Sequence, residues 1–370
     1  MRIGISARGL SVVSGGAKEY IKQLISHLIK IDSSGEYFVY FDSKSYLETF
    51  SAKNLTKVVI KFPSRIIWDH VLLPIRMQRD KIDVGFFPKN VIPYLGGFKK
   101  VVGILDLAYY MPELNAYRAL DTLYMKTLIP GTIRRADKVI TISANTKKDI
   151  FRFIKGTREE KIEVVHLAGS YTKNYGSNRK VRRIYSIGNS PYIFFAGSLS
   201  PRKNIQRTLR ALARIKEQVP HNFVVTGGKS WKDSDIPGLV SKLGLKDRMI
   251  KLGFVEDRDM GNLFAEADMY LHPTLYEGFG MTILEAFAAR CPVISSNVSS
   301  IPEVAGDAAI LVDPYSVDEI AAAIIKLHEN KKLRTDLVKK GLRRLKKFSW
   351  EKTAKETLNV INEVYDSSKK

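Results

Sequence analysis

The sequence has one cysteine, no long apolar run and no cluster of cysteine and histidine residues. Cys291 has no second cysteine to pair with, which excludes a scaffold held by disulfides. No run of about eighteen apolar residues occurs, so we expect no transmembrane helix. The opening residues, MRIGISARGL, enter a strand-like segment directly and lack the apolar core of a signal peptide. These absences predict a cytoplasmic protein without a structural metal site.

Negative charge is scarce relative to positive charge. The 60 lysines and arginines outnumber the 38 aspartates and glutamates, for a net charge of +22. Such an excess is typical of proteins that bind nucleic acid, an anionic membrane surface or phosphorylated ligands. Much of it falls on predicted helix faces such as residues 331–347, where a solvated face is the ordinary explanation. Because the basic clusters lack interleaved aromatics and nucleic-acid motifs, we expect no nucleic-acid partner and favour peripheral contact with the inner face of a membrane.

Short apolar runs alternate with helical stretches along the whole chain of 370 residues. Such alternation implies mostly parallel sheets, so we expect an α/β protein with two Rossmann-like domains. A polar, basic stretch at residues 168–191 is the best linker candidate. We predict strands at residues 2–7, 37–41, 58–60, 84–87, 101–105, 138–142, 162–166, 192–196, 223–226, 249–252, 269–271, 292–294 and 309–312. We predict helices at residues 17–31, 144–154, 205–219, 317–329 and 350–365, with one more beginning near Thr282.

The first predicted strand is followed by a glycine turn. Ser14, Gly15 and Gly16 stand between the strand at residues 2–7 and the helix at residues 17–31. A strand followed by glycines and then a helix is typical of the start of a doubly wound α/β domain. The third glycine of the dinucleotide fingerprint is missing, so the pair alone favours a tight turn over phosphate contact.

The chain is organised around residues 271–294, LHPTLYEGFGMTILEAFAARCPVI. A strand ends near His272, a loop with two glycines follows, and a helix begins at about Thr282. Glycines let a backbone approach a ligand closely. The amides of Gly280, Met281 and Thr282 then point outward at the positive end of the helix dipole. This arrangement predicts an anion site.

Two carboxylates flank that anion site. Glu277 lies in the loop, and Glu285 lies three residues past Thr282 on the same helix face. A carboxylate can accept hydrogen bonds from both hydroxyls of a ribose or sugar diol. The local pattern therefore predicts a nucleotide sugar. For this motif alone, an ordinary loop and amphipathic helix with two solvated glutamates is an equally good interpretation.

A second loop of the same half carries two cations, Arg202 and Lys203, within GSLSPRKN. Both loops join a strand to the following helix, so they are expected at the same sheet edge. The arginine guanidinium can donate two parallel hydrogen bonds to an anion, and the lysine ammonium adds a compact positive charge. Together they can neutralise a diphosphate without a metal ion. The alternative is a solvated helix start, but cations at a helix N-terminus oppose the dipole. We therefore favour a functional role.

Asp233 and Asp235 form an Asp-x-Asp pattern, which in some enzymes holds a metal ion. They follow Trp231 in a polar loop and do not end a strand, so we interpret them as a surface turn. We expect no metal ion and no cofactor besides the nucleotide sugar itself.

The combination of GSLSPRKN, TGGKSW, LGFV, HPTLYEGFGMTILEAFAARCPVISS, SSIPEVAGDAAILVDP and FSWEKTA resembles the family 4 glycosyltransferases of the GT-B fold. Within that family it looks most like the mannosyltransferase-like group of surface-polysaccharide enzymes. The resemblance implies two facing Rossmann-like domains and a C-terminal helix that crosses back to the first domain. We place the domains at residues 1–180, on the acceptor side, and 181–348, on the donor side, with the helix at 349–370.

The resemblance also implies roles for individual residues. Glu285 would hold the donor ribose, and Glu277 would lie beside the hydroxyls of the transferred sugar. Arg202 and Lys203 would bind the diphosphate and stabilise the departing charge. The remaining implied donor contacts are Phe279, Gly280, Met281 and Thr282 at the sugar and phosphate, Gly253, Phe254 and Val255 at the nucleobase, and Gly15 and Gly16 at the phosphates.

Three positions depart from the family pattern. Leu105 stands where a histidine commonly lies near the donor sugar O6, which suggests a 6-deoxy sugar. The next residue, Asp106, is a candidate contact to acceptor or sugar, with a turn or helix-start role as the alternative. Ser198 replaces an arginine, and Arg290 replaces a glycine at a turn where a left-handed residue would be slightly strained.

We therefore expect a retaining, metal-independent glycosyltransferase. It would move a hexose or 6-deoxyhexose from a nucleotide diphosphate sugar to a hydroxyl of a glycan or lipid-linked acceptor. The enzymatic alternative is a nucleotide-sugar epimerase or hydrolase of the same fold. The other alternative is a basic, non-catalytic protein that binds membrane or nucleic acid.

Overall fold

The computed structural model describes residues 1–11, 15–170, 180–227 and 236–369. Ser14 and the Asp233 and Asp235 pattern lie outside the described residues. The chain divides into two compact units, which we describe separately. The first unit holds residues 1–110, 117–168 and 348–370, and the second holds residues 111–116 and 169–347.

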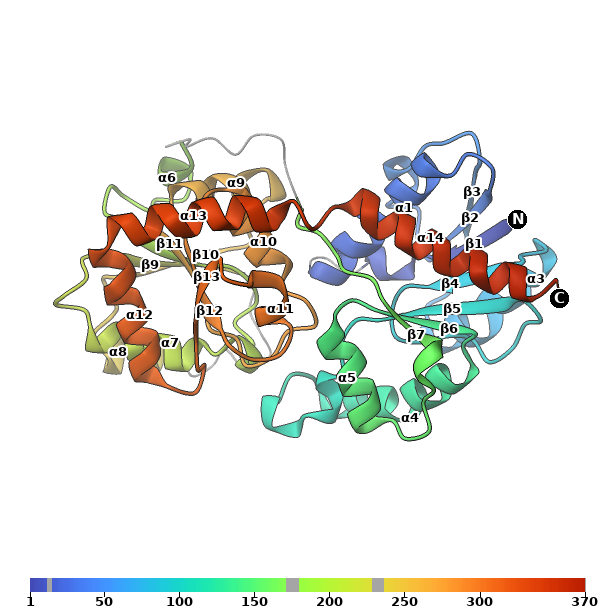
Figure 1. Cartoon of the computed structure of the whole chain (residues 1–370), viewed down its shortest axis with the longest axis horizontal. Coiled ribbons are helices and arrows are strands. Elements are labelled where there is room, and N and C mark those ends of the chain that lie inside the picture. The colour runs from blue at the N-terminus through green and yellow to red at the C-terminus, as the bar shows by residue number, and fades with distance from the viewer. Residues whose placement is uncertain (12–14, 171–179, 228–235, 370) are drawn as a thin grey trace. The chain divides into compact units, whose positions relative to one another are not determined.

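The first unit is built on a seven-stranded parallel sheet in the order β3-β2-β1-β4-β5-β6-β7 (Figure 1). β1 and β4 lie side by side at the point where the order reverses direction. Helices on both faces bury the inner strands, which explains their continuous apolar runs. The strands are β1 (Arg2–Ser6), β2 (Glu36–Phe41), β3 (Leu55–Val59), β4 (Val84–Phe87), β5 (Lys99–Ile104), β6 (Lys138–Thr141) and β7 (Ile162–Val164).

The two ends of the chain meet in this first unit. Helix α1 (Gly16–Ile31) buries Tyr20, whose ring stacks on Trp350 of helix α14 (Trp350–Ser367) with 6.5 Å between ring centroids. Ser349 caps α14 by accepting a hydrogen bond from the Lys352 amide. The C-terminal helix thus returns to the first unit, which confirms the predicted crossing.

The other helices of the first unit include one continuous helical run, formed by α2 (Arg65–Ile67), the π-helical η3 (Trp68–Leu72) and α3 (Leu73–Arg79). Ser143 accepts a hydrogen bond from the Thr146 amide, so the predicted cap of α5 is confirmed. The further helical elements of residues 1–168 are η1 (Arg8–Ser11), η2 (Leu47–Thr49), η4 (Ala108–Tyr110), η5 (Pro112–Leu114), α4 (Ala119–Arg135), α5 (Ala144–Phe153) and η6 (Glu159–Lys161).

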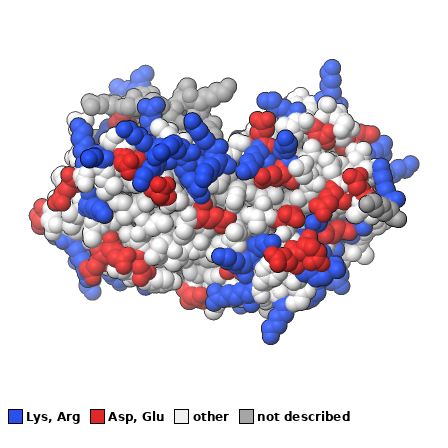
Figure 2. All heavy atoms as spheres, viewed as in Figure 1, with Lys and Arg blue, Asp and Glu red and all other residues white. Residues whose placement is uncertain are grey.

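The second unit has a six-stranded parallel sheet in the order β10-β9-β8-β11-β12-β13. Its strands are β8 (Tyr192–Phe195), β9 (Asn222–Thr226), β10 (Met249–Gly253), β11 (Met269–His272), β12 (Val293–Ser296) and β13 (Ala309–Val312). Its helices are α6 (Lys180–Ile184), η7 (Pro201–Lys203), α7 (Ile205–Arg214), α8 (Ile236–Lys242), α9 (Asp257–Glu266), α10 (Met281–Ala288), α11 (Ile301–Ala305), α12 (Val317–Glu329) and α13 (Lys331–Leu345). Lys and Arg side chains gather along α13 (Figure 2).

Each predicted strand is present, but two predicted segments differ from the structure. The predicted linker at residues 168–191 contains helix α6, which is tied into the second unit because Arg182 donates to a Glu266 carboxylate oxygen at 2.9 Å. The helix predicted to reach residue 219 ends at Arg214, because the chain then leaves the helix before a proline at residue 220.

Candidate functional site

Two strand-to-helix loops meet at the carboxyl ends of β8 and β11, which are neighbours in the sheet of the second unit. The first loop contains Arg202 and the second runs through Thr274 and Leu275. The Leu275 amide and the Thr274 hydroxyl both donate to the Arg202 carbonyl, at 2.8 and 2.9 Å. The structure therefore holds the two loops together, as their places after adjacent strands led us to expect.

A buried ion pair lies at the centre of this loop cluster. Lys203 Nζ donates to Glu277 Oε1 at 2.5 Å and to His272 Nε2 at 3.1 Å. Glu277 Oε2 lies 3.0 Å from an Arg202 guanidinium nitrogen. The side chain of Lys203 is 9% exposed and that of Arg202 is 24% exposed. Each carboxylate oxygen thus faces one cation, and Arg202 is the cation nearer to solvent.

Burial sets the protonation states of this cluster. Burial alone would raise the pKa of Glu277, but the charges of Arg202 and Lys203 hold it well below its ordinary range. Burial lowers the pKa of Lys203, and the Glu277 charge opposes that shift. Burial, with the Lys203 charge, lowers the pKa of His272 to about 4. At neutral pH His272 is therefore uncharged, and its Nε2 accepts a hydrogen bond from Lys203 Nζ.

The loop that carries Glu277 is clamped by its neighbours. Ser299 Oγ accepts from the Glu277 amide at 2.9 Å and donates to the Glu277 carbonyl at 2.6 Å. Ser300 Oγ lies within hydrogen-bond distance of the carbonyls of Glu277 and Phe279, at 2.9 and 2.8 Å. Asn204, with a left-handed φ of 62°, donates to the Pro273 carbonyl at 2.9 Å. These bonds fix the carboxylate before any ligand arrives.

Helix α10 begins next to this cluster. Gly280 precedes its first residue with a φ of 108°, a conformation that favours glycine. Thr282 is held by its hydroxyl, which accepts from Tyr270 at 2.9 Å. Glu285 accepts from the Ser170 amide at 3.4 Å, and its charge acts on the pKa of Lys203. The structure therefore brings Glu277, Glu285 and the start of α10 to one locality.

The residues predicted to flank a nucleobase follow β10, the strand at the edge of the sheet. Gly253 has a left-handed φ of 72° and its carbonyl accepts from the Gly227 amide at 2.8 Å. The Phe254 ring is 66% exposed, whereas Val255 is buried. An exposed ring can stack on a base, so of these three residues Phe254 has the geometry that the prediction requires.

The predicted residues of the first unit form turns. Gly15 caps α1 with a φ of 122°, and a side chain there would meet nothing within 4 Å, so the backbone angle is what requires glycine. Gly16 is the first residue of α1. Asp106 accepts from the Ala108 amide at 3.1 Å and from the Tyr117 hydroxyl at 3.3 Å. These bonds fit the turn role that we kept as the alternative for Asp106.

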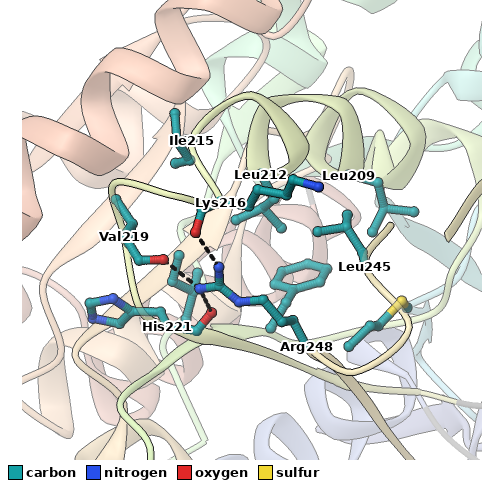
Figure 3. Close-up of a pocket in the computed structure, with 11 residues that line it drawn as sticks. Leu209, Leu212, Ile215, Lys216, Val219, His221, Leu245 and Arg248 are labelled. Atoms are coloured by element: carbon teal, nitrogen blue, oxygen red, sulfur yellow. Dashed lines mark hydrogen bonds between the residues drawn. The ribbon is translucent and has the colours of Figure 1, made fainter. Parts of the chain in front are cut away.

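A separate apolar pocket of about 320 Å³, including open solvent, lies in the second unit against α7 and β9 (Figure 3). Two basic residues, Lys216 and Arg248, line it, and the Arg248 guanidinium donates to the carbonyls of Lys216, Val219 and His221. Those carbonyls belong to the turn that follows α7. Because this guanidinium is already used to close the turn, we interpret the pocket as a packing feature.

Sequence reasoning missed several residues of the loop cluster. We interpreted His272 only as the end of a strand. A buried polar side chain at the end of a strand needs a hydrogen-bond partner, so its position before Pro273 could have indicated a role in the site. Ser299 and Ser300 were quoted within SSIPEVAG without a role. Only contacts between distant segments reveal that these serines clamp Glu277.

Comparison with known proteins agrees with this geometry. Residues 177–344 match the family model of the glycosyl transferases group 1. The chain is 32% identical over 243 residues to O-antigen chain mannosyltransferase B of Escherichia coli, covering 64% of this chain and 63% of that protein. It is 29% identical to MMP alpha-(1->4)-mannosyltransferase of Mycolicibacterium hassiacum, covering 61% of this chain and 54% of that protein. The alignments thus span less than two thirds of these relatives.

Solved structures share the fold. Sucrose-phosphate synthase from Thermosynechococcus elongatus superposes with a TM-score of 0.80 at 17% identity, covering 99% of this chain and 100% of that chain. Anabaena Alr3699/HepE in complex with UDP and glucose gives 0.74 at 18% identity, covering 98% of this chain and 100% of that chain. The chain therefore has the GT-B fold, and its residues 177–344 are similar to the group 1 glycosyl transferases, with mannosyltransferases among the relatives that it matches.

Proposed function

We propose that this protein is a retaining glycosyltransferase that moves a hexose or 6-deoxyhexose from a nucleotide diphosphate sugar to a hydroxyl of a glycan or lipid-linked acceptor. The observation that carries the proposal is the cluster of Arg202, Lys203, Glu277 and His272 beside the start of α10. Curated relatives named as mannosyltransferases support it, as does a structural relative solved with UDP and glucose.

The cluster suits a departing diphosphate. Two cations and one carboxylate leave one net positive charge, because His272 is neutral. The start of α10 adds roughly half a charge from its dipole. Arg202 is partly exposed and can contact a phosphate directly, while the buried Lys203 attracts the phosphate through its positive charge. Fixed charges at a buried site stabilise developing charge without reorganisation.

The proposed reaction proceeds on one face of the donor sugar. The acceptor oxygen forms a bond to the anomeric carbon while the bond from that carbon to the diphosphate breaks. The diphosphate keeps the electron pair, and its oxygen takes the acceptor proton. Glu277 orients the sugar hydroxyls and Glu285 holds the ribose. Arg202 and Lys203 supply the positive charge that a metal ion supplies in other transferases, so we propose that no metal is required.

Leu105 supports a 6-deoxy sugar as the donor. Its amide donates to Asn90 Oδ1 at 2.9 Å, and its side chain offers a methyl surface and no hydrogen-bonding group. An apolar side chain at the sugar O6 position favours a 6-deoxy donor. Leu105→His should shift preference toward a donor that carries the 6-hydroxyl. Unchanged ratios of kcat/KM between the two donor classes would contradict this assignment.

Peripheral membrane contact is part of the proposal. Large apolar side chains of the first unit are exposed at Phe62, Ile66, Ile67, Val71, Ile75, Tyr94, Leu95, Leu120 and Leu123. Several lie on the α2–η3–α3 run, which also carries Arg65, Arg76 and Arg79. Apolar and basic side chains together favour an anionic lipid surface. Across the described residues, no helix is long and apolar enough to cross a membrane.

A donor panel with the purified full chain tests the function. We expect transfer from one nucleotide diphosphate sugar in the presence of EDTA, with product mass increased by one sugar and the donor's anomeric configuration kept, as read by NMR. Conversion of donor without any acceptor would favour an epimerase or hydrolase. A melting temperature raised by nucleic acid and unmoved by every nucleotide would favour a binding protein.

A further inference from the structure

A second charged recess lies entirely within the first unit, at the carboxyl ends of β1 and β4. It is a space of about 420 Å³, including the part open to solvent. Arg8 and Gly9 follow β1, and Pro88 and Lys89 follow β4. These strands are the neighbours at which the strand order reverses. In open α/β sheets, ligands bind in the crevice at this switch point.

The recess has an excess of positive charge. Arg8, Arg65 and Lys89 line it, and Asp69 is the acid that lines it with them. Two nitrogens of Arg8 donate to the two Asp69 oxygens, both at 2.8 Å, and Arg65 Nε lies 3.8 Å from the same carboxylate. Three cations and this acid give +2, and the charge of Asp106, which also acts on Lys89, reduces the local excess to +1. Burial, followed by the charges of Arg65 and Arg8, lowers the pKa of Lys89, so these cations act on one another.

Hydrogen-bonding capacity is also unused beside the recess. Arg65 Nε, His70 Nε2 and the Tyr124 hydroxyl are buried without a hydrogen-bond partner among the described residues. The Arg65 guanidinium lies over the Tyr124 ring, 5.1 Å from its centroid, and the charge of Arg65 acts on the pKa of His70. Native proteins rarely leave buried polar atoms unpaired. Three such atoms beside crowded cations indicate a site that a ligand completes.

A cluster that is balanced before any ligand binds pairs its cations with acids. The second unit shows this arrangement, because the Glu277 carboxylate contacts both Arg202 and Lys203. In the first unit, both Asp69 oxygens are already taken by Arg8. An incoming anionic group would balance the remaining positive charge of the recess. Guanidinium forks and a lysine are the side chains that bind phosphate oxygens.

We propose that this recess binds a phosphate or diphosphate group carried by the acceptor. The identification of the bound molecule as the acceptor rests on the proposed function. The binding of an oxyanion in the recess does not depend on it. A phosphorylated sugar and a lipid-linked diphosphate present the same chemistry to Arg65 and Lys89. The recess therefore selects acceptors by their phosphate group, whereas the loop cluster of the second unit binds the donor.

The location of a bound oxyanion tests the recess directly. Crystals of the full chain soaked in sodium tungstate should show an anomalous peak within contact distance of Arg65 and Lys89. The peak should be lost in Lys89→Met and kept in Lys30→Met, which removes an exposed lysine of α1. Absence of a peak in the wild-type recess would overturn the proposal, whatever the second unit binds.

Kinetics with matched acceptors test the selectivity. Lys89→Met and Arg65→Gln should each raise KM for a phosphorylated or diphosphate-linked acceptor about tenfold, because a charge-assisted bond is lost. Donor KM should stay within about twofold, and the exposed-site control Lys30→Met should change neither value. The larger of the two acceptor effects identifies a sugar phosphate or a lipid diphosphate as the source.

Other outcomes separate the two proposals. An equal KM increase for neutral or carboxylated acceptors would overturn the phosphate assignment, as would an increase confined to the donor. If no nucleotide sugar supports transfer to any acceptor, the proposed function fails. The tungstate result alone then decides whether the recess is an oxyanion site.

Discussion

Each unit of this protein places cations at the carboxyl ends of two central strands, but the two clusters are balanced differently. In the second unit, Glu277 contacts both Arg202 and Lys203. In the first unit, Asp69 is hydrogen-bonded to Arg8 and lies 3.8 Å from Arg65, while Lys89 makes no ion pair among the described residues. A balanced cluster is rigid before a ligand arrives, whereas an unbalanced one needs an anion to complete it. Under the two proposals, the balanced site would stabilise charge that develops, and the unbalanced site would recognise charge that is already present.

Breaking the balance in the second unit should give the largest effect. Glu277→Gln leaves Lys203 buried without its counter-charge, which costs about 3–5 kcal/mol of stability, as for other broken buried pairs. We also expect kcat to fall about 100-fold or more, because the fixed charges at the reaction centre are disturbed. Urea denaturation and kcat at saturating donor measure the two effects. The double variant Lys203→Met with Glu277→Gln should recover stability without recovering kcat, and further destabilisation would contradict the balance.

Acidification should reveal the stability that neutral His272 contributes. An unfolded histidine takes up a proton near pH 6.5, whereas folded His272 does so only near pH 4. The stability that neutral His272 contributes is therefore complete above pH 6.5 and is lost as the pH falls toward 4. The loss should be roughly 3 kcal/mol. The wild-type melting temperature should fall more steeply over this range than that of His272→Gln, and parallel curves would refute the assignment.

Nucleotide affinity should depend on Glu285 of the second unit. Glu285→Ala should weaken binding of the preferred nucleoside diphosphate about tenfold, because charge-assisted hydrogen bonds to the ribose are lost. Glu329→Ala, at the exposed end of α12, is the matched control. Isothermal titration measures both. Equal affinity in Glu285→Ala and wild type would count against the ribose role.

Removing the acid of the first unit should cost less than removing Glu277. Asp69→Asn should lower stability by about 1–2 kcal/mol, because the Arg8 side chain is 23% exposed and water replaces part of the lost interaction. Asp366→Asn, near the end of α14, is an exposed control in the same unit. A loss as large as that of Glu277→Gln in urea denaturation would remove the contrast between the two clusters.

A position outside both clusters should give the smallest change. Arg290 has a left-handed φ of 59° after α10, as its place in the sequence led us to expect. Arg290→Gly should stabilise the protein by about 0.5 kcal/mol, since relief of the strain exceeds the added entropy of the unfolded chain. Arg290→Ala keeps the strain and should not stabilise. A lower melting temperature in the glycine variant would show that the Arg290 side chain makes a contact worth more than the strain.

The two clusters also differ in how far the sequence predicts them. The cluster of the second unit comes from two continuous segments, each of which joins a strand to the next helix. Such segments carry their own signals, so Arg202, Lys203, Glu277 and Glu285 could be named in advance. The pairing of Glu277 with both cations could not be predicted, because it depends on how the two loops pack.

The recess of the first unit is assembled from separate pieces of chain. Arg8 and Lys89 follow different strands, while Arg65 and Asp69 belong to a helical run. None of these positions has a local motif, and a lone arginine after a strand is ordinary in a basic protein. The fold class was predictable because periodicity is a local property. The recess was not, because only the strand order brings its parts together.

The return of α14 to the first unit makes the second unit an insertion between β7 and the last helix. A ribosome therefore finishes the second unit while the first still lacks the helix that covers Tyr20. The amino-terminal part of the protein would then be the last to complete its core, contrary to the usual order of synthesis and folding. A chain cut after residue 347 would retain the whole of the second unit but would leave α1 without its neighbour.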